Sequence, residues 1–217
     1  MRRLSGSLFS LLLLLCSCSD KASQSSAIPY FNESGLTPLW VSSDSIDLVV
    51  PHRIGSFRLT DQNGKAVTEE LMDNKITVVD FFFTSCPGIC PTLSKNMARI
   101  QEQLADTSGI LLLSYSVTPQ ADSVPVLKSY ANAYGAIDGT WHLLTGDRGT
   151  IYDLARESYF ANVDTGADAF LHTEYFYLID GDRRIRGIYN GTLGTEVQNL
   201  LEDINQLKKE SLEERTG

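Results

Sequence analysis

Two cysteines, Cys86 and Cys90, are separated by three residues in the run Cys-Pro-Gly-Ile-Cys. The deprotonated thiol is both the nucleophile of disulfide exchange and the form that binds metal ions. A thiol placed just before a helix meets unpaired backbone N–H groups, which favour the thiolate. The common thioredoxin-type redox motif has two intervening residues rather than three. Metal binding, disulfide exchange and a structural disulfide are all compatible with this spacing, and the spacing alone does not choose among them.

A buried strand and a helix are expected on either side of this pair. Residues 76–83 form an almost continuous apolar run rich in β-branched and aromatic side chains. Such a run is typical of a strand that is buried on both faces. After the second cysteine, apolar residues recur at helical spacing: Leu93, Met97, Ile100 and Leu104. The sequence therefore predicts that the pair lies in the turn between the end of a strand and the start of a helix.

The remaining periodicity predicts a single domain of the α/β class. Further buried strands are expected at 110–117 and 141–145, with helical patterns after each. A hairpin with Asn63-Gly64 at its turn precedes the first strand, and a second hairpin follows at 175–189. A closing helix is expected from about residue 195. This order predicts a central mixed sheet flanked by helices, with a β-hairpin extension on its N-terminal side.

The first residues have the features of a secretory signal. Two arginines precede an apolar run at 8–15, which is shorter than the roughly 20 residues that a membrane-spanning helix needs. The segment 15–18, Leu-Cys-Ser-Cys, resembles a bacterial lipobox. We therefore expect a signal peptide at 1–17 and a lipidated N-terminus at Cys18. An ordinary cleaved signal that leaves Cys18 as a free thiol is the alternative.

The rest of the chain is divided by its composition. A serine-rich stretch predicts a flexible tether at 18–35, the folded domain is expected at 36–209, and a disordered tail at 210–217. Under this division Cys16 leaves with the signal, so Cys86 and Cys90 are the two thiols that remain. They would lie outside the cytoplasm, where disulfides persist.

The charge of the chain excludes one class of partner. The whole sequence carries a net charge of −9, and loss of residues 1–17 removes two arginines and no acid, which gives −11. No run of lysine or arginine stands out. A nucleic-acid-binding surface needs a basic patch, so no nucleic-acid partner is expected.

Several motifs resemble those of the Sco/SenC family of copper chaperones. The run Phe-Thr-Ser-Cys-Pro-Gly-Ile-Cys-Pro at 83–91 is similar to the family's copper motif, and matching blocks lie at 116–119, 141–146, 171–173 and 177–180. The likeness extends from about residue 37 to 207. It implies a thioredoxin-like fold, a membrane anchor outside the cytoplasm, and one copper ion bound by two cysteines and a distant histidine. It also implies a role in assembling the copper centre of cytochrome c oxidase.

The resemblance assigns Cys86, Cys90 and His172 as the ligands of copper, as Cu(I) or Cu(II). Two thiolates and one imidazole suit copper, whereas a structural zinc site normally has four protein ligands. The implied partners are the copper-accepting subunit of a membrane oxidase, the membrane itself through the lipid anchor, and other thiol-redox proteins. The alternative function is a thiol–disulfide oxidoreductase or redox sensor that acts through Cys86 and Cys90. Whether the protein is an enzyme therefore stays open.

One position departs from the family pattern. The family commonly has Asp-Pro where this chain has Thr118-Pro119. Asp122 lies nearby in the sequence and is a candidate substitute for the missing acid. The other two histidines are not assigned to the site: His142 is expected in the core or at its edge, and His52 on the surface.

Overall fold

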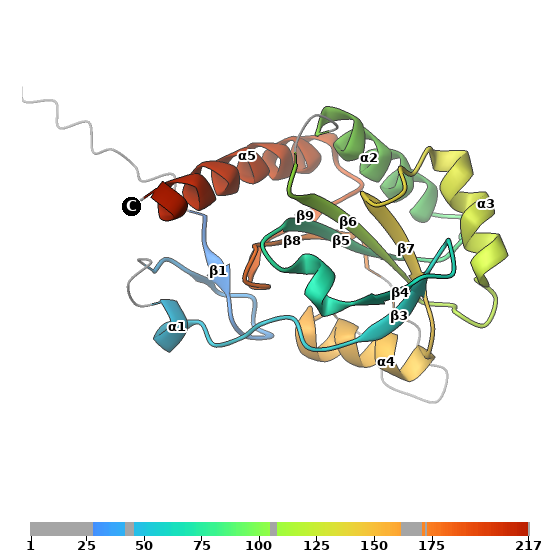
Figure 1. Cartoon of the computed structure of the whole chain (residues 1–217), viewed down its shortest axis with the longest axis horizontal. Helices are drawn as coiled ribbons and strands as arrows, with labels where there is room; N and C mark the ends of the chain where they lie inside the picture. Colours follow the sequence, from blue (N-terminus) through green and yellow to red (C-terminus); the bar gives the residue numbers. More distant parts are fainter. Residues whose placement is uncertain (1–27, 42–45, 105–107, 162–170, 172, 217) are drawn as a thin grey trace, which may run out of the picture.

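The computed structural model describes residues 28–41, 46–104, 108–161, 171 and 173–216 (Figure 1). These residues form one mixed sheet with the strand order β2-β1-β9-β8-β5-β6-β7-β3-β4. The strands are β1 (Tyr30–Phe31), β2 (Pro38–Leu39), β3 (Arg58–Asp61), β4 (Ala66–Thr68), β5 (Ile76–Phe82), β6 (Ile110–Ser116), β7 (Trp141–Thr145), β8 (Tyr175–Ile179) and β9 (Ile185–Asn190). Strands β5, β6 and β7 are parallel, and the other pairings are antiparallel.

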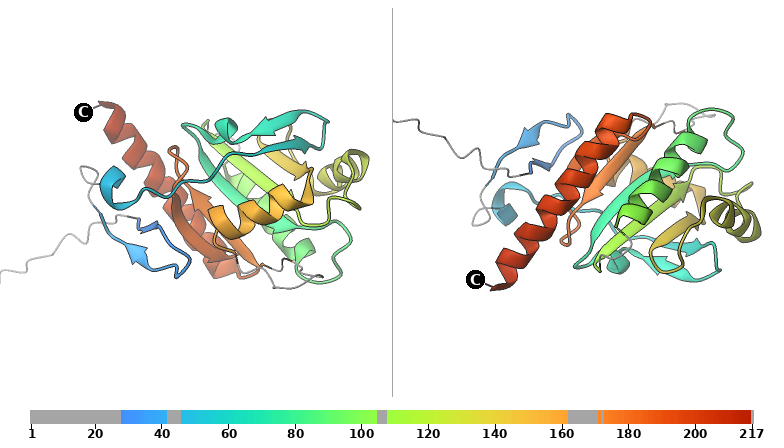
Figure 2. Two further views of the ribbon diagram at one scale, coloured as in Figure 1. Left: turned by 90° about the horizontal axis from the view of Figure 1, so that it is seen from below. Right: turned by 90° about the horizontal axis from the view of Figure 1, so that it is seen from above.

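Helices cover both faces of this sheet. The helical elements in the described ranges are α1 (Ile46–Val49), the 3-10 turn η2 (Glu69–Met72), α2 (Cys90–Gln103), α3 (Val124–Tyr134), α4 (Arg148–Asp153), the π-helical turn η3 (Leu154–Ser158) and α5 (Gly194–Thr216), of which α1 buries no residue. Helices α2, α3 and α5 pack on one face, and α4 lies on the other (Figures 1 and 2). The fold class predicted from the sequence, a mixed sheet flanked by helices, is therefore confirmed.

Strand β5 lies at the centre of the sheet, and its sequence explains why. All seven of its residues are buried, because β6 pairs with it on one side, β8 on the other, and helices cover both faces. Side chains alternate between the two faces of a strand. Val78 and Phe82 therefore face the core under α2 and α5, whereas Val79 and Phe81 face the core on the α4 side. A rigid, fully buried strand thus leads directly into the cysteine loop.

The hairpins and the closing helix agree with the sequence analysis. Strands β3 and β4 pair with Gly64 at their turn, and β3 joins the sheet edge through β7. Strands β8 and β9 form the second hairpin. The closing helix is longer than expected, since α5 continues to Thr216 through most of the segment that we assigned to a disordered tail.

The expected tether also ends earlier than residue 35. Ile28 and Tyr30 are buried, and Tyr30–Phe31 forms strand β1, which pairs with β2 and with β9. The two strands of this small hairpin contain two residues each, too few to produce a recognisable alternation of polar and apolar residues. The folded part of the chain therefore includes residues 28–35, and the part of the predicted tether at 18–27 lies outside the described residues.

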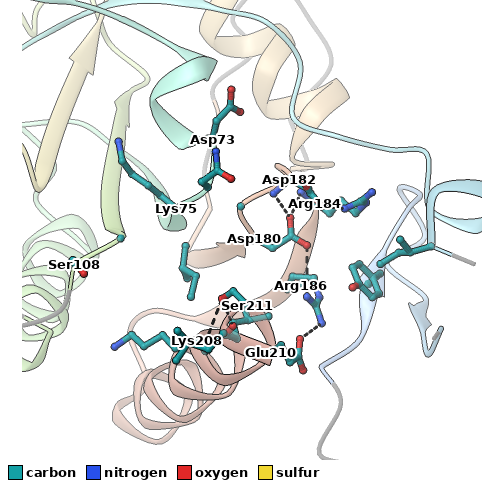
Figure 3. Close-up of a pocket in the computed structure, with 18 residues that line it drawn as sticks. Asp73, Lys75, Ser108, Asp180, Asp182, Arg184, Arg186, Lys208, Glu210 and Ser211 are labelled. Carbon is teal, nitrogen blue, oxygen red and sulfur yellow. Dashed lines mark hydrogen bonds and ion pairs between the residues drawn. The ribbon is translucent and has the colours of Figure 1, made fainter. Parts of the chain in front are cut away.

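The N-terminal segment is fixed at the end of the sheet opposite the cysteine loop. Arg186 of β9 donates through Nη2 to the carbonyl oxygen of Ile28 at 2.9 Å and to Glu210 of α5 at 3.0 Å. Its guanidinium group lies 3.9 Å from the ring centroid of Tyr30. Figure 3 shows Arg186 between Asp180 and Glu210 at the wall of a cavity of about 840 Å³. The ion pair with Glu210, the hydrogen bond to Ile28 and the contact with the Tyr30 ring thus join α5 and the N-terminal segment to β9. Ile76 at the start of β5 also lines this cavity.

Candidate metal centre at the cysteine loop

The cysteine loop occupies residues 83–89, between the end of β5 and the start of α2. Helix α2 begins at Cys90, with Ile89 as its N-cap residue and Pro91 in its first turn. A proline is tolerated there because the first N–H groups of a helix have no intrahelical partner. The backbone N–H of Cys86 donates to the carbonyl oxygen of Phe83 at 3.3 Å, which closes a turn. The predicted strand–loop–helix arrangement is confirmed.

The two thiols are free, and their environments differ. Cys90 is 4% exposed and packs in the core under α2, whereas Cys86 is half-buried. Burial opposes ionisation of Cys86, but hydrogen bonds from the Cys90 thiol and from the backbone N–H groups of residues 88–90 lower the pKa of Cys86 below its ordinary value. Cys86 is therefore the thiol whose negative charge the loop stabilises.

The same interactions act in the opposite direction on Cys90. Burial raises the pKa of the Cys90 thiol to about 12, and its hydrogen bond to Cys86 and the charges of Cys86 and Asp80 add to the effect. Cys86 is therefore the first of the two thiols to lose its proton, and Cys90 is the second. A cation that binds both sulfurs must displace the proton of Cys90.

Asp80 is an unexpected carboxyl group beneath the loop. It is 1% exposed, and it lies in β5 between Val78 and Phe82 on the face covered by α2. Burial raises the pKa of its carboxyl group to about 7, although a hydrogen bond from Ser114 acts against the shift. Among the residues that the structure describes, none makes a hydrogen bond to its Oδ1 atom. The sequence analysis did not single out Asp80, because the apolar run around it was interpreted only as a buried strand. The presence of one acid inside that run was the available signal.

Asp122 is fully buried at the base of the same loop. Its Oδ1 accepts from Thr84 Oγ1 at 2.5 Å, and its Oδ2 accepts from Ser116 Oγ at 2.5 Å and from Thr118 Oγ1 at 3.0 Å. The candidate substitute for the family's aspartate is therefore engaged with hydroxyl groups of the strand ends. Thr118, which stands where the family commonly has aspartate, donates one of these hydrogen bonds to Asp122.

Two residues predicted for the site or its anchor, His172 and Cys18, lie outside the described residues. Among the residues it does describe, no three histidine, cysteine or acidic side chains are grouped so that they could hold a metal ion. The described part of the candidate centre consists of the two thiols.

The other histidines are placed elsewhere. His142 is buried, and its Nδ1 lies 3.1 Å from Asp61 Oδ2, which confirms a core position. His52 is half-buried, with Nε2 2.9 Å from the carbonyl oxygen of Ser158 and its ring packed on Phe160. Neither residue belongs to the cysteine loop. No helix within the described ranges combines the length and the apolar character needed to cross a membrane.

Comparison with known proteins identifies relatives over most of the folded part. The family model described as SCO1/SenC matches residues 49–209. A SCO1 protein homologue of Bacillus subtilis is 31% identical over 157 residues, which covers 70% of this chain and 81% of the relative. The family model thus spans the cysteine loop, strands β3 to β9 and most of α5.

Solved structures agree with this relationship. A SCO1/SenC family lipoprotein from Bacillus anthracis has a TM-score of 0.66 at 27% identity, covering 72% of this chain and 95% of that one. BsSco, described as having a disulfide switch and as a member of the Sco family of cytochrome c oxidase assembly proteins, has a TM-score of 0.64 at 29% identity, with 73% and 94% covered. Bradyrhizobium japonicum ScoI with copper bound has a TM-score of 0.55 at 28% identity, with 70% and 98% covered.

These likenesses confirm the thioredoxin-like fold that the motifs implied. The matched region contains the two cysteines, the strand that precedes them and the helix that follows. The chain belongs to the SCO1/SenC family.

Proposed function

We propose that this protein binds one copper ion through Cys86, Cys90 and His172 and passes it to the copper-accepting subunit of a membrane oxidase. Copper is the cargo in this proposal, and assembly of the copper centre of cytochrome c oxidase is the process served. A Sco relative is described as a cytochrome c oxidase assembly protein, and another was solved with copper bound.

The observation that supports it most directly is the state of the two thiols. A hydrogen bond joins Cys86 in the loop to Cys90 at the start of α2, and Cys86 is the thiol whose pKa is lowered. Thiolate and imidazole ligands suit Cu(I) and Cu(II), so the donor set that the family motif assigns fits copper chemically. Uptake of the ion at both sulfurs releases the Cys90 proton, whose removal is opposed by the raised pKa of that thiol. Delivery reverses this exchange, because the returning proton helps Cys90 to release the metal.

Copper titration of the reduced full chain tests the proposal. We expect one equivalent to bind, with thiolate-to-Cu(II) charge-transfer absorption. Loss of an outer partner of a metal ligand already costs about 10–100-fold in affinity, so Cys86→Ala and Cys90→Ala should each cost at least as much. His172→Ala should greatly weaken Cu(II) binding. His52→Ala is the matched control and should bind as wild type does. Equal binding by all of the variants would contradict the proposal.

We also propose that Cys18 carries a lipid that holds the domain on a membrane of the bacterial cell envelope. The lipobox-like segment at 15–18 supports this, and one relative is described as a lipoprotein. A tether raises the effective concentration of the domain at a membrane-bound client. In detergent-phase partitioning of protein made in a lipoprotein-processing bacterium, Cys18→Ser should move to the aqueous phase. Cys16→Ser should stay in the detergent phase, and aqueous partitioning of wild type would exclude the anchor.

A second candidate function is thiol–disulfide exchange, which the unequal thiols favour. Cys86 would attack a client disulfide, Cys90 would resolve the mixed disulfide, and the client would leave reduced while Cys86 and Cys90 become oxidised. An external dithiol would then restore the pair. Turnover of a disulfide substrate after complete removal of copper would support this function, and its absence would favour copper transfer.

A further inference from the structure

The buried carboxylate of Asp122 joins three separate parts of the chain. Thr84 belongs to the cysteine loop, Ser116 ends β6, and Thr118 follows that strand. All three hydroxyl groups donate to Asp122, at 2.5, 2.5 and 3.0 Å respectively. The backbone N–H of Thr84 also donates to Oδ2, at 3.3 Å. Both carboxylate oxygens of Asp122 therefore accept hydrogen bonds, and the residue is fully buried.

These contacts fix the residue from which the cysteine loop starts. Thr84 is held to Asp122 by both its side chain and its backbone, two residues before Cys86. Val117 N–H donates to the carbonyl oxygen of Phe82 at 2.9 Å, so β5 and β6 are also joined at this point. The turn that follows aims the N–H groups of residues 88–90 at the Cys86 sulfur. A displacement of Thr84 would be passed directly to that turn.

A buried carboxylate is costly unless hydrogen bonds satisfy it. Thr118 provides one of those bonds through its hydroxyl group. Thr118 therefore helps to stabilise the buried carboxylate of Asp122.

We propose that Asp122 is a positioning residue of the cysteine loop, which it holds in the geometry that captures copper by fixing Thr84 to the ends of β5 and β6. The inference rests on the proposed copper-binding function and adds a residue that contacts neither the metal nor the thiols. Asp122 acts through Thr84, and Thr118 and Ser116 complete its hydrogen bonds.

Asp122→Asn tests this, because it keeps the shape of the side chain while turning one acceptor into a donor that faces other donors. In competition with a chromophoric Cu(I) chelator, the full-length variant should bind Cu(I) at least about tenfold more weakly than wild type. The matched control is Asp61→Asn. Asp61 is equally buried and accepts from the N–H groups of Asn63 and Lys65, both at 2.9 Å, but it organises the β3–β4 turn. Asp61→Asn should lower the melting temperature while keeping the Cu(I) affinity within twofold.

A second pair of variants keeps the test decisive if Asp122→Asn does not fold. Thr84→Val removes one hydroxyl and keeps the backbone bond, so it should weaken Cu(I) binding in the same direction by a smaller factor. Thr84→Ser should restore the affinity to within twofold. Wild-type affinity in Thr84→Val, or an equal loss of affinity in Asp61→Asn and Asp122→Asn, would overturn the proposal.

A metal-free measurement separates this inference from the copper function itself. In the reduced apoprotein, Asp122→Asn should slow alkylation of Cys86 at pH 7 at least about threefold, since the N–H groups that stabilise its thiolate are no longer held in place. If wild type takes up no copper, the proposed function fails, and a slowed alkylation still supports the role of Asp122. If the alkylation rate is unchanged, the positioning role is excluded even when wild type binds copper.

Discussion

At neutral pH, iodoacetamide should modify Cys86 at least about a hundredfold faster than Cys90 in the reduced, metal-free protein. The thiolate is the reacting species, and its fraction falls tenfold for every pH unit below the pKa. Burial raises the pKa of Cys90 to about 12, whereas hydrogen bonds from the loop lower the pKa of Cys86. Cys90 is also 4% exposed, so the reagent reaches it less easily. Ionisation and access thus favour the same thiol.

The two cysteines fall in one tryptic peptide, 76–95, so fragmentation of that peptide by mass spectrometry is needed to assign each label. The matched variants are Cys86→Ser and Cys90→Ser. With an aromatic disulfide reagent, Cys90→Ser should accumulate a mixed disulfide at Cys86, since no resolving thiol is left. Cys86→Ser should react at least about tenfold more slowly. Equal labelling of the two cysteines in wild type would contradict the assignment of Cys86 as the first thiol to act.

This order of reactivity bears on both proposed functions. A donor of copper would meet the Cys86 thiolate first, and the second sulfur would bind only as the Cys90 proton leaves. A client disulfide would be attacked by the same sulfur. The described part of the site therefore has one reactive thiol and one that completes the reaction, whichever function the cell uses. Copper binding and disulfide formation would compete for the two thiols, because oxidation would remove both proposed copper ligands at once.

The sequence predicts those parts of the fold whose patterns are long. Strand β5 and helix α2 are found from continuous burial and from a repeat of apolar residues, and they place the cysteine loop correctly. The small β1–β2 hairpin is missed, because its stability comes from contacts with Arg186 and β9 that lie more than 150 residues away. Tertiary contacts of this kind leave no local pattern.

The chemistry of the site is only partly predictable for the same reason. The spacing of Cys86 and Cys90 indicates thiol chemistry, and the family motif assigns metal ligands. The difference between the two thiols depends on how deeply each is buried, which the motif does not contain. The role of Asp122 depends on three hydroxyl groups that meet only when the ends of β5 and β6 are paired.

Replacing Asp80 by asparagine should make the stability of the protein much less dependent on pH. Burial raises the pKa of this carboxyl group from 3.8 to about 7 in the folded state. The folded protein therefore holds the proton more tightly than the unfolded chain does. Stability from this group is fully present below about pH 4, falls as the pH rises, and is lost above about pH 7. At 1.36 kcal/mol per pH unit, the loss amounts to about 4 kcal/mol.

Urea unfolding of wild type and Asp80→Asn at pH 4 and pH 8 measures this directly. The difference in free energy of unfolding between the two proteins should change by about 4 kcal/mol, in favour of the variant at pH 8. Any effect of the asparagine amide on the free energy of unfolding that is the same at both pH values cancels in this comparison. Asp147→Asn is the control of opposite sign. Backbone and side-chain hydrogen bonds from Thr150 lower the pKa of Asp147, so the stability that its carboxylate contributes to the fold is lost as the pH falls.

The same substitution connects stability with the site. The charge of Asp80 is one of the causes that raise the pKa of Cys90, so Asp80→Asn should also speed alkylation of Cys90 at high pH. A carboxyl group that weakens the fold at neutral pH and keeps Cys90 protonated would favour release of the metal over its retention. If Asp80→Asn and wild type lose stability in parallel between pH 4 and pH 8, the Asp80 carboxyl group does not titrate in this range, and the predicted pH dependence of stability is wrong.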